Sequence, residues 1–310
     1  MANLRDIKGK IRAVGKTRQV TRAMEAVSAA KMRRSQEKAI VARPYAVSAF
    51  HILRSLSQSI DKNQISLMQE RAFTKPLIVL VTSDRGLAGS LNSAVLKKVN
   101  QFIASKNLAR AEVGFVTIGK KGYEHYSKRG YTIVQHAEKF VDAPEIFVVE
   151  EIAKQVFELF ESGAYSHVYV VYSNFISTFA QEPHFHEVLP LSFEGVDAMI
   201  KGITPTKGKY AELFKEENGE NNHSIIYTYE PSIEEVLRGT ILSLTTATIY
   251  HAVLEAKASE YSARMVAMRS ASDKALEMGS ALTLKYNKAR QSAITREVSE
   301  IIGGIEALAK

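Results

Sequence analysis

The last quarter of the chain, residues 232–310, contains no proline and repeats small or hydrophobic residues at alternating steps of four and three. The repeat runs through Leu237, Ile241, Leu244, Thr248, His251, Leu254, Ala258, Tyr261, Met265, Met268, Ser272, Ala275, Gly279, Leu282, Tyr286 and Ala289. A mean spacing of 3.5 residues keeps this stripe on one side only when the helix winds left-handed around a partner. At 1.5 Å per residue, the helix would be about 115 Å long, more than a compact domain can contain. The chain must therefore supply a partner helix, and the pair must project.

The partner is expected at the other end of the chain, where residues 3–57 show helical spacing. The repeat there consists of Leu4, Ile7, Ile11, Val14, Thr17, Val20, Met24 and Val27. Pro44 is expected to kink this helix without ending it, since hydrophobic spacing resumes beyond it. Ser232 and Glu235 form a capping box that predicts where the last helix begins. We therefore predict an antiparallel coiled coil of residues 1–57 and 232–310, with the longer helix overhanging by about 35 Å.

The middle of the chain alternates between strand and helix patterns. The continuous hydrophobic run 77–81 is typical of a strand buried on both faces. We expect further strands at 112–118, 131–135, 167–172 and near 187–193, with helices at 91–105 and 144–161 and a helical turn at 120–128. Such alternation predicts a mostly parallel, three-layer, Rossmann-like α/β domain over residues 76–195. Residues 196–231 are expected to be a polar insertion and connector, most polar at 206–224.

Charge is concentrated at the N-terminal end. The whole chain has a net charge of +8, yet residues 1–60 alone hold thirteen Lys or Arg against three Asp or Glu. A helix this basic can bind nucleic acid, acidic lipid or an acidic protein surface, or it can simply be solvated. One alternative is therefore a coiled-coil protein that organises nucleic acid. The chain has no Cys, which excludes disulfides and thiolate zinc sites, and no hydrophobic run long enough to cross a bilayer.

The loop after the first buried strand, residues 82–92, reads TSDRGLAGSLN and contains Asp84, Arg85, Gly86 and Gly89. Glycines between a strand and a helix can present backbone amides to a phosphate, which leaves a nucleotide-using enzyme as a second alternative. The loop matches neither established phosphate-binding pattern, however. The structural interpretation is a tight turn with positive φ at Gly86 or Gly89, and with Asp84 or Ser90 capping the next helix.

The sequence shows no recognisable arrangement of catalytic residues. His184 and His186 could point to one face of a strand, but no carboxylate pattern accompanies them, so a metal site is not favoured. We expect no catalytic residue, no metal and no cofactor.

The C-terminal tip combines the polar segment 287–295 with Ile301, Ile302, Ile305 and Leu308. If this part overhangs its partner, its hydrophobic side chains would be exposed, which usually marks insertion into another protein. The other reading is a frayed terminus.

Three blocks give the chain a family resemblance over almost its full length. They are IRAVGKTRQVTRAMEAVSAAKM at 11–32, SDRGLAGSLN at 83–92, and the pair SEYSARMVAM at 259–268 and YNKARQSAITRE at 286–297. The chain resembles the gamma subunit of F-type ATP synthase, the central rotor shaft. It departs from the family at Ala88 and Ser90, where Cys and Gly are common, and in the polar segment 206–224. It also lacks the cysteine pair of chloroplast members, so their thiol regulation is not expected.

The resemblance implies a non-catalytic rotor subunit that couples proton-driven rotation of the c-ring to conformational cycling of the beta subunits. Its expected partners are three alpha and three beta subunits, the epsilon subunit and the membrane c-ring, with no nucleic acid and no small-molecule substrate of its own. Arg290, Gln291, Thr295 and Glu297 match the family's rotor–stator contact. Met24, Arg264 and Met268 match coupling-sensitive positions. The expected location is peripheral, on the cytoplasmic face of a bacterial plasma membrane.

Overall fold

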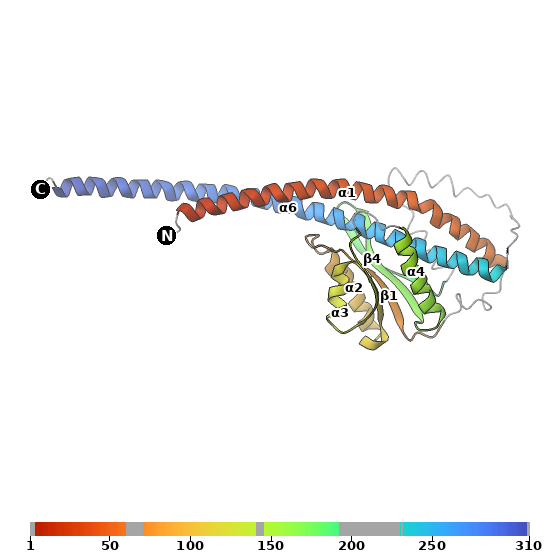
Figure 1. Cartoon of the computed structure of the whole chain (residues 1–310). Coiled ribbons are helices and arrows are strands. Elements are labelled where there is room, and N and C mark those ends of the chain that lie inside the picture. The colour runs from red at the N-terminus through yellow and green to blue at the C-terminus, as the bar shows by residue number, and fades with distance from the viewer. Residues whose placement is uncertain (1–3, 60–70, 141–145, 192–229, 231, 309–310) are drawn as a thin grey trace. The chain divides into compact units, whose positions relative to one another are not determined.

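The structure is a computed structural model that describes residues 4–59, 71–140, 146–191, 230 and 232–308 (Figure 1). The chain divides into two compact units, one formed by residues 1–29 with 264–310 and the other by residues 30–263. Two long helices, α1 (Leu4–Ser59) and α6 (Ile233–Leu308), each contribute to both units. The predicted polar insertion at 206–224 lies outside the described residues.

The larger unit, which we call the sheet unit, is built on a five-stranded sheet. Its strands are β1 (Pro76–Val81), β2 (Gly114–Ile118), β3 (Thr132–Ala137), β4 (His167–Ser177) and β5 (Ala180–Leu189). They lie in the order β3-β2-β1-β4-β5, with β1 to β4 parallel and β5 antiparallel to β4. Every residue of β1 and β2 is buried, as expected for parallel strands covered on both faces.

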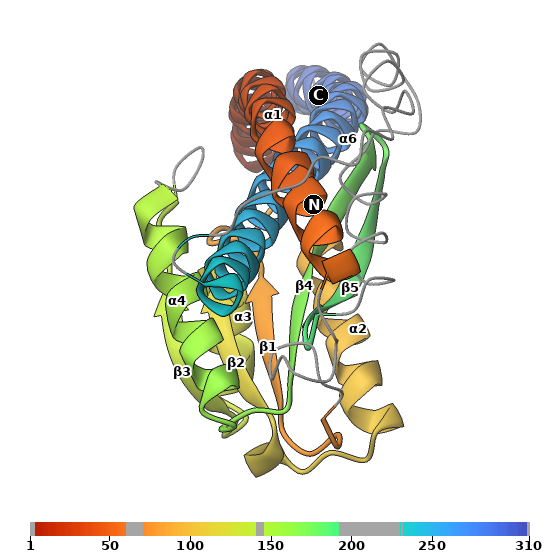
Figure 2. The same cartoon turned by 90° about the vertical axis from the view of Figure 1, so that its right-hand side faces the viewer.

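Helices cover both faces of this sheet, which confirms the predicted three-layer architecture (Figure 2). One face carries α2 (Leu91–Ser105) and α3 (Lys120–Ser127), whose hydrophobic side chains pack with Ile78, Leu80 and Phe115. The other face carries α4 (Ile146–Glu161) and the first part of α6, which pack with Leu77, Val79 and their neighbours. A short 3-10 turn, η2 (Arg110–Glu112), precedes β2.

The last strand was predicted in the wrong place. We expected it near 187–193, but β5 runs from Ala180 to Leu189 and pairs back onto β4, with His184 opposite Tyr172. The strand was missed because an edge strand need not be continuously hydrophobic, and it tolerates Pro183 within it. Its partner β4 likewise continues to Ser177, five residues beyond the predicted end.

The first part of the hydrophobic stripe on α6 was also misassigned. Leu237, Ile241 and Leu244 belong to the sheet core, which the coiled-coil prediction did not foresee. Over two or three turns, a stripe that suits a helix partner suits a flat sheet face equally well. The predicted start of α6 is supported, since the backbone N–H of Glu235 donates to Ser232 Oγ at 3.2 Å.

The middle of α6 is buried on all sides, because every residue from His251 to Ser262 is buried. One side packs on the sheet through Ala252, Val253 and Ala256. Residues of α1 beyond position 30 lie against it as well, since Lys31 Nζ lies 5.5 Å from the ring centre of Tyr261.

In the smaller unit, α1 and α6 form the predicted antiparallel helix pair. Val14 lies over Gly279, where an added Cβ would be 3.9 Å from Val14 Cγ1. Beyond residue 267, the positions of α6 that are not exposed are 268, 271, 272, 275, 279, 282, 286, 289 and 293. Apart from residue 271, they continue the predicted stripe. We call this stripe, together with the residues of α1 that face it, the seam.

On α1, the seam departs from the prediction after Val14. Thr21 and Ser28 are buried, whereas Val20 and Val27 are 58% and 56% exposed. The predicted repeat continued in steps of three, but the 3.5-residue period requires a step of four at that point. Small polar residues occupy the seam there, and the two valines face outward.

Candidate functional site

The strongest candidate site is the end of α6 that extends beyond its partner (Figure 1). If Val14 lies opposite Gly279, then antiparallel pairing places Leu4 opposite residue 289. From Arg290 to Ile305, every residue except Ala293 is exposed. The 19 residues from 290 to 308 would extend for about 28 Å, somewhat less than the predicted overhang.

The exposed end of α6 is two-sided. With about 100° of rotation per residue, five large hydrophobic side chains fall within one arc of the helix. They are Ile294, Val298, Ile301, Ile302 and Ile305, each between 49% and 62% exposed, and we call them the tip stripe. The opposite side of the helix carries small or polar residues, including Ser292, Ser299, Gly303 and Gly304.

The tip stripe is not a continuation of the seam. Its centre lies about 130° around the helix from the line through Gly279, Tyr286 and Ala293. A partner that covers it must therefore be a different one from α1. Burying such side chains yields about 1.5–3 kcal/mol each, so the tip stripe is suited to a protein partner.

The four predicted contact residues border the tip stripe. Arg290 and Glu297 lie along one edge, and Gln291 and Thr295 lie along the other, by the same helical geometry. All four are exposed, and the Thr295 hydroxyl donates to the backbone oxygen of Gln291 at 3.0 Å. The arrangement is a hydrophobic strip with a polar rim, which is the usual anatomy of a protein interface.

The three predicted coupling residues lie elsewhere in the smaller unit. Arg264 and Met268 are buried, and Met24 is half-buried. The pairing of Val14 with Gly279 places Met24 at the level of Met268 in the seam. Methionine fills irregular gaps well, so these two can tolerate small shifts between the helices. The predicted site residues therefore fall into two groups, one at the tip and one in the seam.

The loop after β1 is a structural clamp. Asp84 Oδ1 accepts the backbone N–H of Lys120, and Oδ2 accepts that of Lys139, both at 3.1 Å. One carboxylate thus fastens the end of β1 to the start of α3 and to the segment after β3. Asp84 does cap a helix, although it caps α3 and not α2 as expected. Ser90 makes no side-chain cap of α2.

Backbone conformation supports the same interpretation of this loop. Gly89 has a φ of 58°, as the tight-turn interpretation predicted, and Leu87 shares the left-handed region with a φ of 63°. The backbone N–H of Ser83 donates to Asn92 Oδ1 at 3.0 Å, and Asn92 Nδ2 donates to Ser83 Oγ at 2.7 Å. The loop residues satisfy one another's hydrogen-bonding groups, so the loop conformation does not require a bound phosphate.

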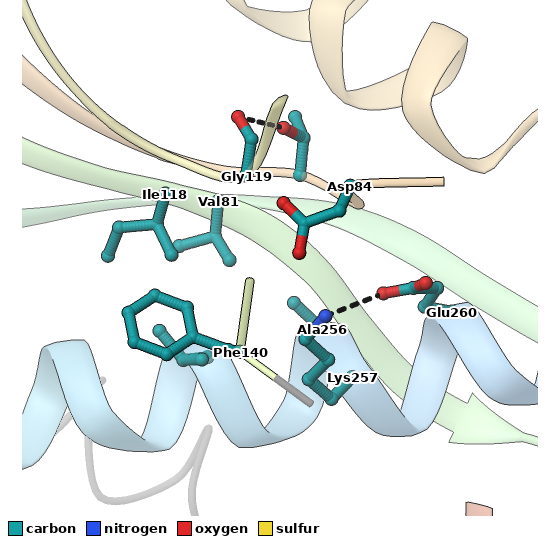
Figure 3. A pocket seen from close by; sticks show the side chains of 10 residues that line it. Val81, Asp84, Ile118, Gly119, Phe140, Ala256, Lys257 and Glu260 are labelled. Atoms are coloured by element: carbon teal, nitrogen blue, oxygen red, sulfur yellow. Dashed lines mark hydrogen bonds and ion pairs between the residues drawn. The ribbon is translucent and has the colours of Figure 1, made fainter. Parts of the chain in front are cut away.

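The place where a nucleotide would sit is filled by the chain itself. In doubly wound sheets, ligands bind beyond the carboxyl ends of the parallel strands. Here Val253, Ala256 and Lys257 of α6 occupy that region, and the Asp84 carboxylate points toward them (Figure 3). Lys257 Nζ lies 3.1 Å from Glu260 Oε2. The remaining cavity of about 10 Å³ has room for one water molecule and none for a nucleotide.

The histidines of β5 stack on one another. The rings of His184 and His186 are 5.8 Å apart and nearly parallel. Burial lowers the pKa of both, and burial together with the neighbouring His184 lowers that of His186 to about 4. Within the described part of the chain, no three His, Asp or Glu side chains gather in a way that could hold a metal ion.

Sequence reasoning missed a set of polar contacts on α6, formed by Glu255, Ser259 and Ser262. These side chains bind the backbone of the β4–β5 hairpin. The only sequence signal was the clustering of small and charged residues in EAKASEYS, in the middle of an otherwise hydrophobic stripe.

Comparison with known proteins places this architecture in a family. Residues 3–308 match the family model described as ATP synthase. The "ATP synthase gamma chain" of Roseiflexus castenholzii is 39% identical over the whole of both chains. The "ATP synthase gamma chain, sodium ion specific" of Acetobacterium woodii is 38% identical over 99% of each chain.

Two solved structures share the fold. A chain of the Euglena gracilis mitochondrial ATP synthase aligns with a TM-score of 0.62 at 19% identity, covering 98% of this chain and 94% of that one. A chain from the central stalk and c-ring structure of the Tetrahymena thermophila enzyme aligns with a TM-score of 0.60 at 22% identity, covering 82% and 99%. Among the described residues, no helix combines the length and hydrophobicity that a bilayer crossing requires. By sequence and by fold, the chain belongs to the ATP synthase gamma-chain family.

Proposed function

We propose that this chain is the rotating central shaft of an ATP synthase and that it catalyses no reaction itself. In this proposal, proton-driven rotation of the c-ring turns the shaft, and the shaft drives the conformational cycle of the catalytic beta subunits. The observation that carries the proposal is the tip stripe with its polar rim. It is a one-sided hydrophobic surface at the end of a helix pair, on a different face from the seam.

One-sidedness is what a shaft needs in order to act on identical subunits. Three beta subunits around the helix would meet different faces of it at any instant. Only the subunit that meets the tip stripe could bury hydrophobic surface against it, so the three would differ in their preferred conformation. Turning the shaft would then pass each subunit through every state. On the rim, Arg290 and Gln291 supply donors, and Glu297 an acceptor, for a stator loop.

The basic outer face of α1 suits an acidic partner. Arg5, Lys8, Lys16, Arg22 and Arg34 are all exposed. Such a surface would attract an acidic segment of the beta subunit and speed its approach at low salt. The exposed Val20 and Val27 add hydrophobic contact on the same helix.

The remaining partners that we propose are the epsilon subunit and the c-ring. The sheet unit would bind the epsilon subunit and the c-ring at the membrane surface, which places the protein peripherally on the cytoplasmic face of a bacterial plasma membrane. Protons are the proposed coupling ion. Because one relative is named as sodium ion specific, the test is ATP synthesis by the reconstituted complex under a pH gradient and under a sodium gradient.

The central experiment is co-expression with alpha and beta subunits. We expect a complex whose ATP turnover requires this chain. Changing Arg290→Ala together with Gln291→Ala should reduce the torque per ATP, measured by bead rotation, while the isolated chain melts as before. Lys274→Met, at an exposed position on the same helix, is the control. Failure of the wild-type chain to form a complex would refute the proposal.

The exposed basic face of α1 also keeps nucleic-acid binding as a second candidate. That function predicts binding to duplex DNA whose affinity falls steeply as salt rises. An electrophoretic titration at low salt that detects no complex would eliminate it.

A further inference from the structure

The β4–β5 hairpin is held to α6 by three polar side chains on one stripe of the helix. Glu255 Oε2 accepts the backbone N–H of Phe175 at 3.2 Å. The Ser259 hydroxyl donates to the backbone oxygen of Ser173 at 2.9 Å, and the Ser262 hydroxyl donates to that of Thr178 at 2.7 Å. We call these three side chains the polar key.

The spacing of the polar key matches the repeat of a helix face. Glu255, Ser259 and Ser262 are separated by four and three residues, so they lie above one another on one side of α6. They are 6%, 0% and 0% exposed. The bond of Ser259 is buried and the other two are part-buried, so losing them is costly, most of all at Ser173, whose backbone oxygen has no water to replace the hydroxyl.

The part of the hairpin that the key holds is the part beyond the central sheet. β1 pairs with β4 only as far as Val171. From Ser173 to Ser177, β4 pairs with β5 alone among the described strands. This arm therefore depends on α6 for support, and the bonds of the polar key are made to the arm rather than to the sheet.

Nonpolar packing alone would resist rotation of α6 about its own axis less firmly than packing combined with hydrogen bonds. The helix faces the sheet core here with Ala252, Val253 and Ala256, of which two are small and smooth. Dispersion contacts of this kind have little direction, whereas hydrogen bonds weaken steeply when donor and acceptor turn away from each other. Three bonds along about two turns of helix oppose both rolling and sliding of the helix.

We propose that Glu255, Ser259 and Ser262 are positioning residues that key α6 to the β4–β5 arm, so that rotation of the sheet unit is carried into the long helix. The inference rests on the proposed rotor function. The polar key touches no nucleotide and acts through the helix that it holds.

The test uses Ser259→Ala combined with Ser262→Ala. The control is Thr248→Val, which removes another buried hydroxyl, one that bonds to the backbone oxygen of Leu244 in its own helix. In the isolated chain, amides of residues 173–181 should exchange with deuterium about tenfold faster in the double variant, and at the wild-type rate in the control. This first measurement does not depend on any partner.

The second measurement uses the complex assembled with the other synthase subunits in vesicles. The double variant should hydrolyse ATP while losing ion pumping per ATP hydrolysed, whereas the control should keep the wild-type ratio. A purely structural role would lower assembly and melting temperature but leave the ratio in assembled complexes unchanged, and that result would overturn the inference. A wild-type chain that assembles no pumping complex would instead refute the rotor function, and the inference with it. Unchanged exchange at 173–181 would refute the key alone.

Discussion

The two halves of α6 use one helical repeat in different surroundings. From Ile233 to Ala263 the helix is part of the sheet unit, and in its middle it is buried on every side. From Arg264 onward, it offers one narrow stripe to α1, and its end carries the exposed tip stripe. The hydrophobic spacing is nearly the same throughout.

The difference shows that the period of a pattern identifies a face but not what covers it. In the first half, residues between the repeat positions, such as Ala252, Val253 and Ala256, are buried as well and complete the core. In the second half, the positions between the repeat residues are exposed beyond residue 271. The first half of the helix is in contact around most of its surface and anchors it in the sheet unit, and we call it the anchor. The second half contacts α1 along a narrow stripe only.

The largest expected effect separates the anchor from the tip. Ile241→Ala removes a fully buried side chain from the sheet core and should lower the free energy of unfolding by about 2–5 kcal/mol. Ile301→Ala makes the same chemical change at an exposed position and should shift it by less than about 0.5 kcal/mol. Urea denaturation followed by circular dichroism measures both. Equal effects would show that the two halves do not differ as described.

A second pair of variants tests how closely the seam is packed. Ala275→Leu inserts a larger side chain at a buried seam position and should destabilise the helix pair by about 1–3 kcal/mol. Ala281→Leu makes the same change at an exposed position and serves as control. Hydrogen exchange of amides in residues 4–29 reports on this pair. Protection that is unchanged in Ala275→Leu would mean that the helices lie further apart there.

The general architecture was predictable because strong periodic signals determine it. Buried parallel strands such as β1 read as continuous hydrophobic runs, and the 3.5-residue repeat required two paired helices. The β4–β5 arm was not predictable in the same way, since an edge strand held by backbone contacts leaves no continuous pattern. The shift of the seam at Thr21 was hidden for a related reason. Small polar residues fit between close helices, so the most hydrophobic positions were not the buried ones.

The site was predictable in part. The rim residues Arg290 and Gln291 were identified by resemblance, and the position of the tip stripe could be worked out from helical geometry. The polar key could not, because Glu255, Ser259 and Ser262 look like an ordinary solvated helix face until their partners are known. Those partners are backbone groups, which carry no sequence signature.

Acid should weaken the sheet unit through His186. Its pKa is about 4 in the folded chain, against 6.5 for an ordinary histidine, because it is buried beside His184. The unfolded chain therefore binds a proton at a higher pH than the folded chain does. Stability from this group is complete above about pH 6.5 and is lost as the pH falls toward 4, by about 1–2 kcal/mol given its partial exposure. Denaturation at several pH values should show this slope, and His186→Gln should reduce it. An equal slope in the variant would contradict the assignment.

The smallest effects are expected at two exposed ion pairs, one in each half of α6. Arg238 holds Glu161 of α4 through two hydrogen bonds of 2.8 Å, and this pairing lowers the pKa of Glu161. Lys274 meets Glu277 within its own helix at 2.6 Å. Glu161→Gln should cost up to about 1 kcal/mol because the bond is bidentate and ties two elements together, whereas Glu277→Gln should cost less because its partner Lys274 is fully exposed. Both losses should shrink in 1 M salt, where the screening length is about 3 Å. If Glu277→Gln proved the more costly in denaturation experiments, then an ion pair within one helix would outweigh the pair that ties α6 to α4, contrary to this prediction.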